Sequence, residues 1–169
     1  MRRSVSILSG EDHDAIEGAP VCDVMYRDNA ITQRDSMTLY AGSCLCGTVT
    51  FEVEGRFDSF YLCHCKRCQK DTGSAHAANL FAQSAKLTWR SGADAVNSFT
   101  LPGTRHKRSF CRVCGSALPS THIPDLVIVP AGSLDVEVPV PATAHIFTAS
   151  KAAWERGSGS AAEFKGLPE

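Results

Sequence analysis

Cysteines are the residues of this chain whose type and spacing point most directly to chemistry. Seven of the eight lie in three short clusters, which are Cys44 and Cys46, then Cys63, Cys65 and Cys68, then Cys111 and Cys114. Thiols this close in sequence rarely reach disulfide geometry with one another, but they converge easily on one metal ion. The spacing therefore favours metal binding over disulfides, with zinc as the expected ion.

The number of thiolates around zinc decides what the ion can do. Four thiolates close a tetrahedron, whereas three leave a position for water or substrate. The pair Cys111 and Cys114, followed by Gly115, is typical of a zinc knuckle. The pair Cys44 and Cys46 is its expected partner. We therefore predict a closed structural site with four thiolates, which joins distant parts of the chain and stabilises the fold.

The middle cluster offers three thiolates within six residues and has no obvious fourth cysteine. Cys63, Cys65 and Cys68 are therefore predicted to hold a catalytic zinc ion with one open position. One alternative is that His64 closes the site as a fourth ligand, although its ring should point away from the flanking thiols in extended backbone. Another alternative is a metal-free redox cluster, since C-x-x-C thiols can exchange disulfides.

A basic run, Arg105-His106-Lys107-Arg108, precedes the third cluster. The simpler interpretation is a solvated strand face. The functional interpretation is that Arg105 and Arg108 bind the carboxylates of an acidic thiol substrate. His76 and His145 are candidates for acid or base work, but a lone histidine is more often a hydrogen-bonded structural residue.

Composition narrows the class of protein. The chain has 169 residues, of which 43% are hydrophobic and 21% charged, and its net charge is −1. This length suits one domain. The chain lacks the excess of positive charge that is typical of proteins that bind nucleic acids or anionic membrane surfaces. The apolar runs are too short for a transmembrane helix, and the first residues do not resemble a secretory signal. We therefore expect the protein to lie in the cytoplasm, where thiols stay reduced.

The chain divides into three parts by its patterning. Residues 1–38 show no clear apolar period and are interpreted as an extension, with a natural start at Met37 as an alternative. Cys22 lies in this segment without neighbouring ligands and is interpreted as a free thiol. Residues 39–156 form the expected zinc-binding domain, and residues 157–169 are typical of a linker.

Short strands dominate the predicted domain. Alternation and turn signals predict them at 48–54, 75–81, 86–89, 96–100, 107–110, 126–129 and 144–148. One short helix is expected over 66–72, ended by Gly73, and another is expected from a cap at Ser150 to Trp154. The sequence therefore predicts a mostly β, largely antiparallel domain with little helix.

These motifs together resemble the glutathione-dependent formaldehyde-activating family, also called the centromere protein V-like domain. The resemblance rests on Gly42-Ser43-Cys44-x-Cys46-Gly47, Cys63-His64-Cys65-x-x-Cys68 with Thr72-Gly73, Phe110-Cys111-x-x-Cys114-Gly115-Ser116, Gly132-Ser133-Leu134-Asp135, His145-Ile146-Phe147 and Ser150-Lys151-x-x-Trp154. It runs in order from about Gly42 to Trp154. Gln69 stands where the family often has arginine.

The resemblance implies a β-tent fold with antiparallel sheets and two zinc ions per chain. It assigns Cys44, Cys46, Cys111 and Cys114 to the structural ion, and Cys63, Cys65 and Cys68 to the catalytic ion. It also implies a carbon–sulfur lyase similar to S-(hydroxymethyl)glutathione synthase, which joins glutathione and formaldehyde. The alternatives are a zinc lyase for another small thiol or aldehyde, and a non-catalytic zinc module that binds a protein partner. A homo-oligomer is compatible with either, and a nucleic-acid partner is not expected.

Overall fold

The structure, a computed structural model, describes residues 38–155, 159 and 161–165. The predictions for Cys22 and Met37 lie outside the described residues, as does part of the predicted linker. In the described part of the chain, strands are the main element. They are β1 (Thr38–Ser43), β2 (Thr50–Gly55), β3 (Ser59–Cys63), β4 (Ala77–Gln83), β5 (Lys86–Ser91), β6 (Val96–Thr100), β7 (Lys107–Cys111), β8 (Ala117–Leu118), β9 (Ser120–Ile123), β10 (Leu126–Pro130) and β11 (Ala144–Ile146).

Helical structure is limited to short segments. The α-helix α1 spans Lys66–Thr72, and four 3-10 turns follow the strands: η1 (Ala93–Ala95), η2 (Ala131–Ser133), η3 (Thr148–Ser150) and η4 (Ala153–Glu155). Gly73 ends α1 in the left-handed conformation, at φ 65°, and its N–H donates to the carbonyl of Gln69 at 2.9 Å. This is the stop that the sequence predicts, because glycine reaches positive φ without steric cost.

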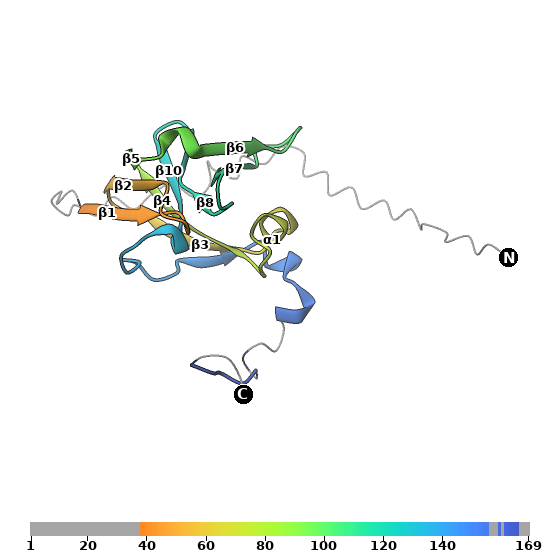
Figure 1. Ribbon diagram of the computed structural model, residues 1–169. Helices are drawn as coiled ribbons and strands as arrows, with labels where there is room; N and C mark the ends of the chain where they lie inside the picture. Colours follow the sequence, from red (N-terminus) through yellow and green to blue (C-terminus); the bar gives the residue numbers. More distant parts are fainter. Residues whose placement is uncertain (1–37, 156–158, 160, 166–169) are drawn as a thin grey trace. The chain divides into compact units, whose positions relative to one another are not determined.

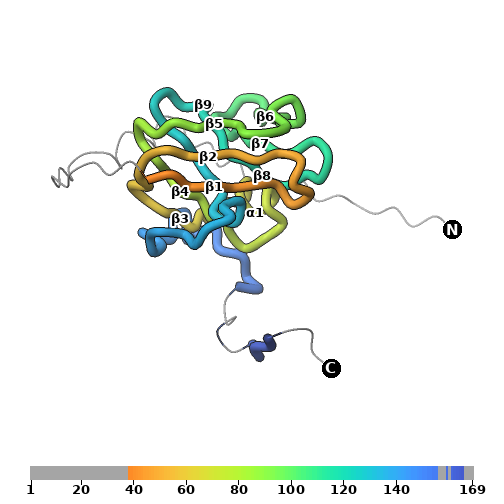
Figure 2. The backbone as a smooth tube through the Cα atoms, turned by 60° about the vertical axis from the view of Figure 1, so that its left-hand side comes forward, coloured from red at the N-terminus to blue at the C-terminus, as the bar shows by residue number. Residues whose placement is uncertain are grey.

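The strands form three sheets (Figure 1). Their strand orders are β1-β2-β5, β11-β3-β4-β10-β9 and β6-β7-β8. In Figure 2 the strands β5, β2 and β1 run one below the other, as their pairing requires. Every described pairing is antiparallel except that of β11 with β3, which is parallel. The prediction of a mostly β, largely antiparallel fold is therefore confirmed.

The core is built from the inward-facing residues of β2, β4 and β10. Phe51 and Val53 alternate with half-buried neighbours along β2, and their relative exposures are 1% and 0%. Leu80 of β4 and Val129 of β10 are also fully buried and belong to the same hydrophobic cluster. The two-residue alternation that predicts β2 from sequence is thus the alternation that fills the core.

Several elements differ from the sequence prediction. The strand expected at 144–148 ends at Ile146, because Phe147 adopts a left-handed backbone, at φ 56°. The prediction of one short helix from Ser150 to Trp154 is wrong, because two 3-10 turns, η3 and η4, occupy this region instead. The strands β8 and β9 were not predicted, because two and four residues are too short to show a period.

Gly42 at the end of β1 has no room for a side chain. A Cβ there would run into the ring of Phe51 and lie 2.5 Å from the carbonyl oxygen of Ser133. We expect Gly42→Ala to lower the free energy of unfolding by about 1–3 kcal/mol, the usual cost of overpacking. Urea denaturation measures this difference. Gly132→Ala is the matched control, because a Cβ at Gly132 meets nothing within 4 Å; equal stability losses in both variants would contradict the steric explanation.

Candidate metal centre

Two tight turns carry the four cysteines predicted to form the structural site. The first turn joins β1 to β2, and in it the N–H of Cys44 donates to the carbonyl of Val49 at 3.0 Å. Gly47 closes this turn at φ 72°, and its N–H donates to the carbonyl of Cys44 at 2.9 Å. Cys46 lies between them. The C-x-C-G sequence thus forms a turn in which the backbone needs a positive φ, and glycine adopts it without steric cost.

The second turn joins β7 to β8 and has the same design. The N–H of Gly115, at φ 76°, donates to the carbonyl of Cys111 at 2.8 Å. The carbonyl of Ser116 accepts a hydrogen bond from the N–H of Cys111 at 2.9 Å. The hydroxyl of Ser116 also accepts from the N–H of Leu45 at 3.1 Å, which ties the two turns directly together. Local sequence does not indicate this role of Ser116, because the contact spans 71 positions.

The four thiols brought together by these turns lie close enough to share one ion. The sulfur atoms of Cys44, Cys46, Cys111 and Cys114 all lie within 4.8 Å of one another. Two of the separations are 3.5 Å, from Cys44 to Cys46, and 4.0 Å, from Cys46 to Cys111. Zinc–sulfur bonds of about 2.3 Å in a tetrahedron place sulfurs about 3.8 Å apart. The donor set therefore fits zinc.

Polar groups around two of these thiols, Cys44 and Cys114, favour the ionised form and lower the pKa, whereas burial contributes to a raised pKa at Cys111. The backbone N–H of Val49 donates to the sulfur of Cys44 at 3.3 Å. The hydroxyl of Ser116 lies 3.4 Å from the sulfur of Cys114, and hydrogen bonds from the Ser116 side chain and backbone lower the pKa of Cys114 to about 5. Metal ligands must be deprotonated, so these contacts prepare the thiols for an ion.

The three remaining clustered cysteines lie where β3 passes into α1. Cys63 ends β3, and Cys65 is the N-cap of α1. The sulfur of Cys65 accepts a hydrogen bond from the N–H of Cys68 at 3.4 Å, which holds the first turn of the helix. The three sulfur atoms lie within 4.8 Å of one another. The end of β3 and the first turn of α1 thus bring the three thiols together.

This three-thiol cluster is partly accessible to solvent. Cys63 is buried, whereas Cys65 and Cys68 are partly exposed. A hydrogen bond from the Cys68 thiol lowers the pKa of Cys63 to about 6, and the same bond raises the pKa of Cys68. Cys63 is therefore the thiol of this pair that ionises first. The three sulfurs fit a zinc ion with a position left over.

His64 does not complete the three-thiol cluster. Its ring is fully buried on the other side of the chain, with Nε2 at 2.8 Å from Nδ1 of His145 and Nδ1 at 3.0 Å from a carboxylate oxygen of Glu155. Both ring nitrogens thus face groups other than the thiols, as extended backbone at His64 predicts. The alternative in which His64 is the fourth thiol-site ligand has no support in this arrangement.

Comparison with known proteins identifies the family. The sequence model of the family described as "Glutathione-dependent formaldehyde-activating enzyme" matches residues 39–150, which is more than half of the chain. The chain belongs to this family. The resemblance seen in the motifs is therefore confirmed, and it associates the chain with glutathione-dependent activation of formaldehyde.

The other comparisons add little to the family match. A search of curated proteins returned no match. Three solved chains match, including a crystal structure of a Rhodobacter sphaeroides protein with 24% identity and a TM-score of 0.46. That similarity covers 59% of this chain and 91% of the other. Within the described residues, no helix is long and apolar enough to span a membrane.

In this member of the glutathione-dependent formaldehyde-activating family, the three-thiol cluster borders a cavity of about 210 Å³. Cys68 lies on its wall, and so do both arginines of the basic run, Arg105 and Arg108. The structure therefore brings the two predicted carboxylate-binding residues to the cavity that adjoins the predicted catalytic thiols. Asp71 also lines this cavity and adds a negative charge to its wall.

The two arginines differ in the contacts that they make within the protein. Nη1 of Arg108 donates to the carbonyl of Asp71 at 2.9 Å and lies 3.1 Å from its carboxylate, while Nη2 donates to the carbonyl of Gly115 at 3.0 Å. Arg108 therefore connects α1 to the turn that carries Cys114, and it is not simply part of a solvated face. Among residues 38–155, Arg105 forms no ion pair.

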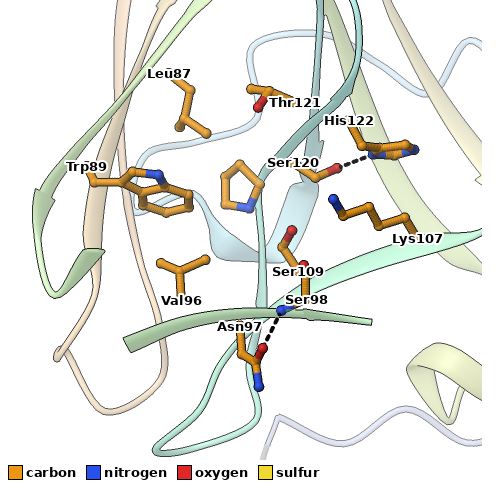
Figure 3. A pocket seen from close by; sticks show the side chains of 11 residues that line it. Leu87, Trp89, Val96, Asn97, Ser98, Lys107, Ser109, Ser120, Thr121 and His122 are labelled. Atoms are coloured by element: carbon orange, nitrogen blue, oxygen red, sulfur yellow. Dashed lines mark hydrogen bonds between the residues drawn. The ribbon is translucent and has the colours of Figure 1, made fainter. Parts of the chain in front are cut away.

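A second cavity of about 230 Å³ lies between β5, β6, β7 and β9 (Figure 3). Trp89, Lys107 and His122 line it, and no cysteine does. Nδ1 of His122 lies 3.0 Å from the hydroxyl of Ser120, and burial, followed by the charge of Lys107, lowers the pKa of this histidine. This cavity is similar in volume to the one beside Cys68, but it is not lined by any of the clustered cysteines.

Two motif residues that are not cysteines help to position the four-thiol site. The hydroxyl of Ser43 donates to the carboxylate of Asp135 at 2.8 Å, and the N–H of Asp135 donates to the carbonyl of Ala41 at 3.0 Å. These bonds hold the end of β1 directly before Cys44. The sequence signal for Asp135 was its place in the Gly132-Ser133-Leu134-Asp135 motif, which does not by itself indicate this contact.

Proposed function

We propose that this chain joins glutathione to formaldehyde and forms S-(hydroxymethyl)glutathione as a zinc-dependent enzyme of the carbon–sulfur lyase class. The observation that carries the proposal is the partly exposed cluster of Cys63, Cys65 and Cys68, because Cys68 opens on the cavity that Arg105 and Arg108 line. Family membership supports the choice of glutathione and formaldehyde as substrates.

The proposed reaction needs a thiolate, an aldehyde and little else. A zinc ion held by the three thiolates supplies a Lewis acid, which favours the ionised form of a substrate thiol near pH 7. The glutathione sulfur gives an electron pair to the aldehyde carbon, so a carbon–sulfur bond forms and the C=O π pair moves to oxygen. The oxygen takes up one proton and the thiol has lost one, so the reaction consumes neither acid nor base.

The residues of the chain contribute mainly by positioning. Arg105 and Arg108 offer guanidinium groups to the carboxylates of glutathione, and the planar fork of arginine suits that geometry. Holding the thiol beside the aldehyde converts an encounter of two solutes into a reaction within one complex. The four-thiolate site is proposed to hold a second, structural zinc ion, which keeps the β1–β2 and β7–β8 turns together. The proposal also places the protein in the cytoplasm, where glutathione keeps thiols reduced.

The proposed activity is tested by following adduct formation with two-dimensional exchange NMR, which separates catalysed from spontaneous exchange. The zinc-loaded chain should accelerate exchange between free glutathione and its hydroxymethyl adduct. Cysteine, coenzyme A and other small thiols are tested beside glutathione, and longer aldehydes beside formaldehyde. Acceleration with another pair alone would assign the chain to a different thiol-adduct reaction. No acceleration with any pair would favour a non-catalytic zinc module.

Arg105 provides a direct test of how the thiol is bound. We expect Arg105→Ala to raise KM for glutathione about tenfold while kcat changes little, because a partly solvated charge contact to substrate contributes on the order of 1 kcal/mol. Steady-state kinetics with glutathione, and with a thiol that lacks carboxylates, measures the effect. The carboxylate-free thiol should show the same KM in both proteins.

The matched control is Arg108→Ala, since this guanidinium is held by Asp71 and Gly115. That variant should lose folding stability as well as thiol affinity, whereas Arg105→Ala should keep its stability. An unchanged KM for glutathione in Arg105→Ala would remove Arg105 from the binding site.

A further inference from the structure

A third group of side chains that could bind a metal ion shares no residue with the two cysteine clusters. It consists of His64, His76 and Glu155. Each offers one donor atom, and these atoms lie within 4.8 Å of one another. We propose that they form a third metal site, with two imidazole nitrogens and one carboxylate, which takes a divalent transition-metal ion such as zinc.

The donor atoms of this histidine–glutamate site converge without bonding to one another. Nδ1 of His64 lies 3.0 Å from one carboxylate oxygen of Glu155, and Nδ1 of His76 lies 3.9 Å from the other. The shorter contact nevertheless lacks hydrogen-bond geometry. Nδ1 of His64, Nδ1 of His76 and the near oxygen of Glu155 are all buried without a hydrogen-bond partner. Leaving buried polar atoms unpaired is costly, so three such atoms around one point indicate a common partner.

A proton shared between His64 and Glu155 does not satisfy this group. An ion pair would place an N–H of His64 in line with the carboxylate, and that alignment is absent. One proton would also leave Nδ1 of His76 without a partner. A cation at the centre accepts lone pairs from all three donors at once. Two histidines with one carboxylate is a donor set that zinc uses, and it differs from the thiolate sets of the other clusters.

A further histidine supports the orientation of His64. Nε2 of His64 lies 2.8 Å from Nδ1 of His145, and the two rings are stacked with their centroids 5.1 Å apart. Ligating histidines commonly donate their second ring N–H to a neighbouring acceptor, which fixes the tautomer that leaves the other nitrogen free for the metal. His145 provides that acceptor. His64 itself has no exposed surface, so its ring is held in this orientation.

The proposed ion would connect distant parts of the chain. His64 precedes α1, His76 precedes β4 and Glu155 ends η4, near the end of the continuously described chain. The amide of Gln69 already joins the same regions, since it donates to the carbonyls of His64 and Ser150 at 2.5 and 2.8 Å. The third ion would therefore hold the η3–η4 segment against the loop that carries Cys63 and Cys65.

Cobalt titration of the full chain tests the third site. The metal-free protein first receives two equivalents of zinc per chain, which the thiolate clusters take up in preference to the histidine–glutamate site, and cobalt(II) is then added. We expect native mass spectrometry to show one further equivalent per chain. Its visible spectrum should have the weak d–d bands of nitrogen and oxygen ligands, without the intense charge-transfer band of thiolate ligands.

Two variants locate the added ion. His76→Ala and Glu155→Gln should each weaken cobalt binding by more than about tenfold and leave the zinc content of the thiol clusters unchanged. Glu155→Gln nearly preserves the shape of the side chain, so it separates ligand loss from misfolding. His122→Ala is the matched control, because His122 is not one of the three donors of the proposed site, and this variant should bind cobalt like the original chain.

Three results would overturn the third site. They are no further equivalent in the zinc-loaded chain, cobalt binding unaffected by both variants, and cobalt that enters only with a thiolate charge-transfer band. The formaldehyde reaction is tested separately. Cys65→Ser removes a ligand of the thiol cluster but should retain the histidine–glutamate ion, so failure of one proposal leaves the other standing.

Discussion

Cys65→Ser is expected to lower kcat/KM for glutathione and formaldehyde by on the order of a thousandfold, while the fold is retained. Loss of a Lewis acid removes several kcal/mol of transition-state stabilisation, and each 1.36 kcal/mol is about a factor of ten. Cys65 is also the N-cap of α1, where its sulfur accepts from the N–H of Cys68. Serine is itself a favoured N-cap, so this substitution removes the ligand and keeps the cap.

The measurements for Cys65→Ser are steady-state kinetics, zinc content and circular dichroism on the same preparation. Zinc content should fall by one ion per chain and the spectrum should not change. Cys65→Ala is the matched comparison, because it removes both the ligand and the cap, and it should cost about 1 kcal/mol more in stability. Full activity in Cys65→Ser would show that the three-thiol cluster is not catalytic. Collapse of the fold would show that its ion is structural.

Cys46→Ser is expected to destabilise the domain by several kcal/mol, although Cys46 is an exposed residue. Substitution of an exposed side chain with no special role usually changes stability by less than about 0.5 kcal/mol. A structural zinc ion can supply on the order of 10 kcal/mol of folding free energy, which is comparable to the total stability of a domain. Loss of one of four thiolates should therefore unfold a substantial fraction of the protein.

Thermal unfolding with and without a zinc chelator measures this effect. The matched control is Leu45→Ser, which changes the neighbouring residue of the same turn, where Leu45 is 87% exposed. The chelator should destabilise the original chain and Leu45→Ser strongly, and Cys46→Ser much less. If Cys46→Ser and Leu45→Ser unfold at the same temperature, the four-thiol cluster does not hold a stabilising ion.

Local sequence patterns predicted the parts of the molecule whose partners lie nearby. Alternation predicted β2, whose burial follows the two-residue period, and a continuous apolar run predicted β10, where Leu126, Val127 and Val129 are buried. The three-thiol cluster was predicted from spacing alone, since its ligands span six residues. The helix α1 was predicted with its stop at Gly73, because that position needs a left-handed backbone.

Contacts between distant residues were beyond local patterns. His64 and His145 stand 81 positions apart, and neither has neighbours in sequence that indicate a shared site. Arg108 was interpreted as part of a basic run, and only the fold shows that it joins Asp71 to Gly115. A run of charges looks the same in sequence whether it is solvated or held by carbonyl groups. Only the fold shows that the carbonyl groups of Asp71 and Gly115 lie close enough to accept hydrogen bonds from Arg108.

The proposed function rests on an unequal division of seven thiols between two proposed zinc ions. Cys44, Cys46, Cys111 and Cys114 surround one position, and two turns hold them there. The sulfurs of Cys63, Cys65 and Cys68 lie close enough to share a second ion, and Cys68 also lines a cavity. The distances and burial of the described residues fit both sets, and the open side of the smaller set is where the proposed chemistry takes place.

A crystal structure of the zinc-loaded chain with glutathione, recorded at the zinc absorption edge, tests this division most directly. We predict one anomalous peak surrounded by four cysteine sulfurs, and a second surrounded by Cys63, Cys65, Cys68 and one atom that does not belong to the protein. The glutathione sulfur should occupy that fourth position. A fourth protein side chain on the second ion, or oxidised sulfurs with no ion among them, would contradict the proposed catalytic site.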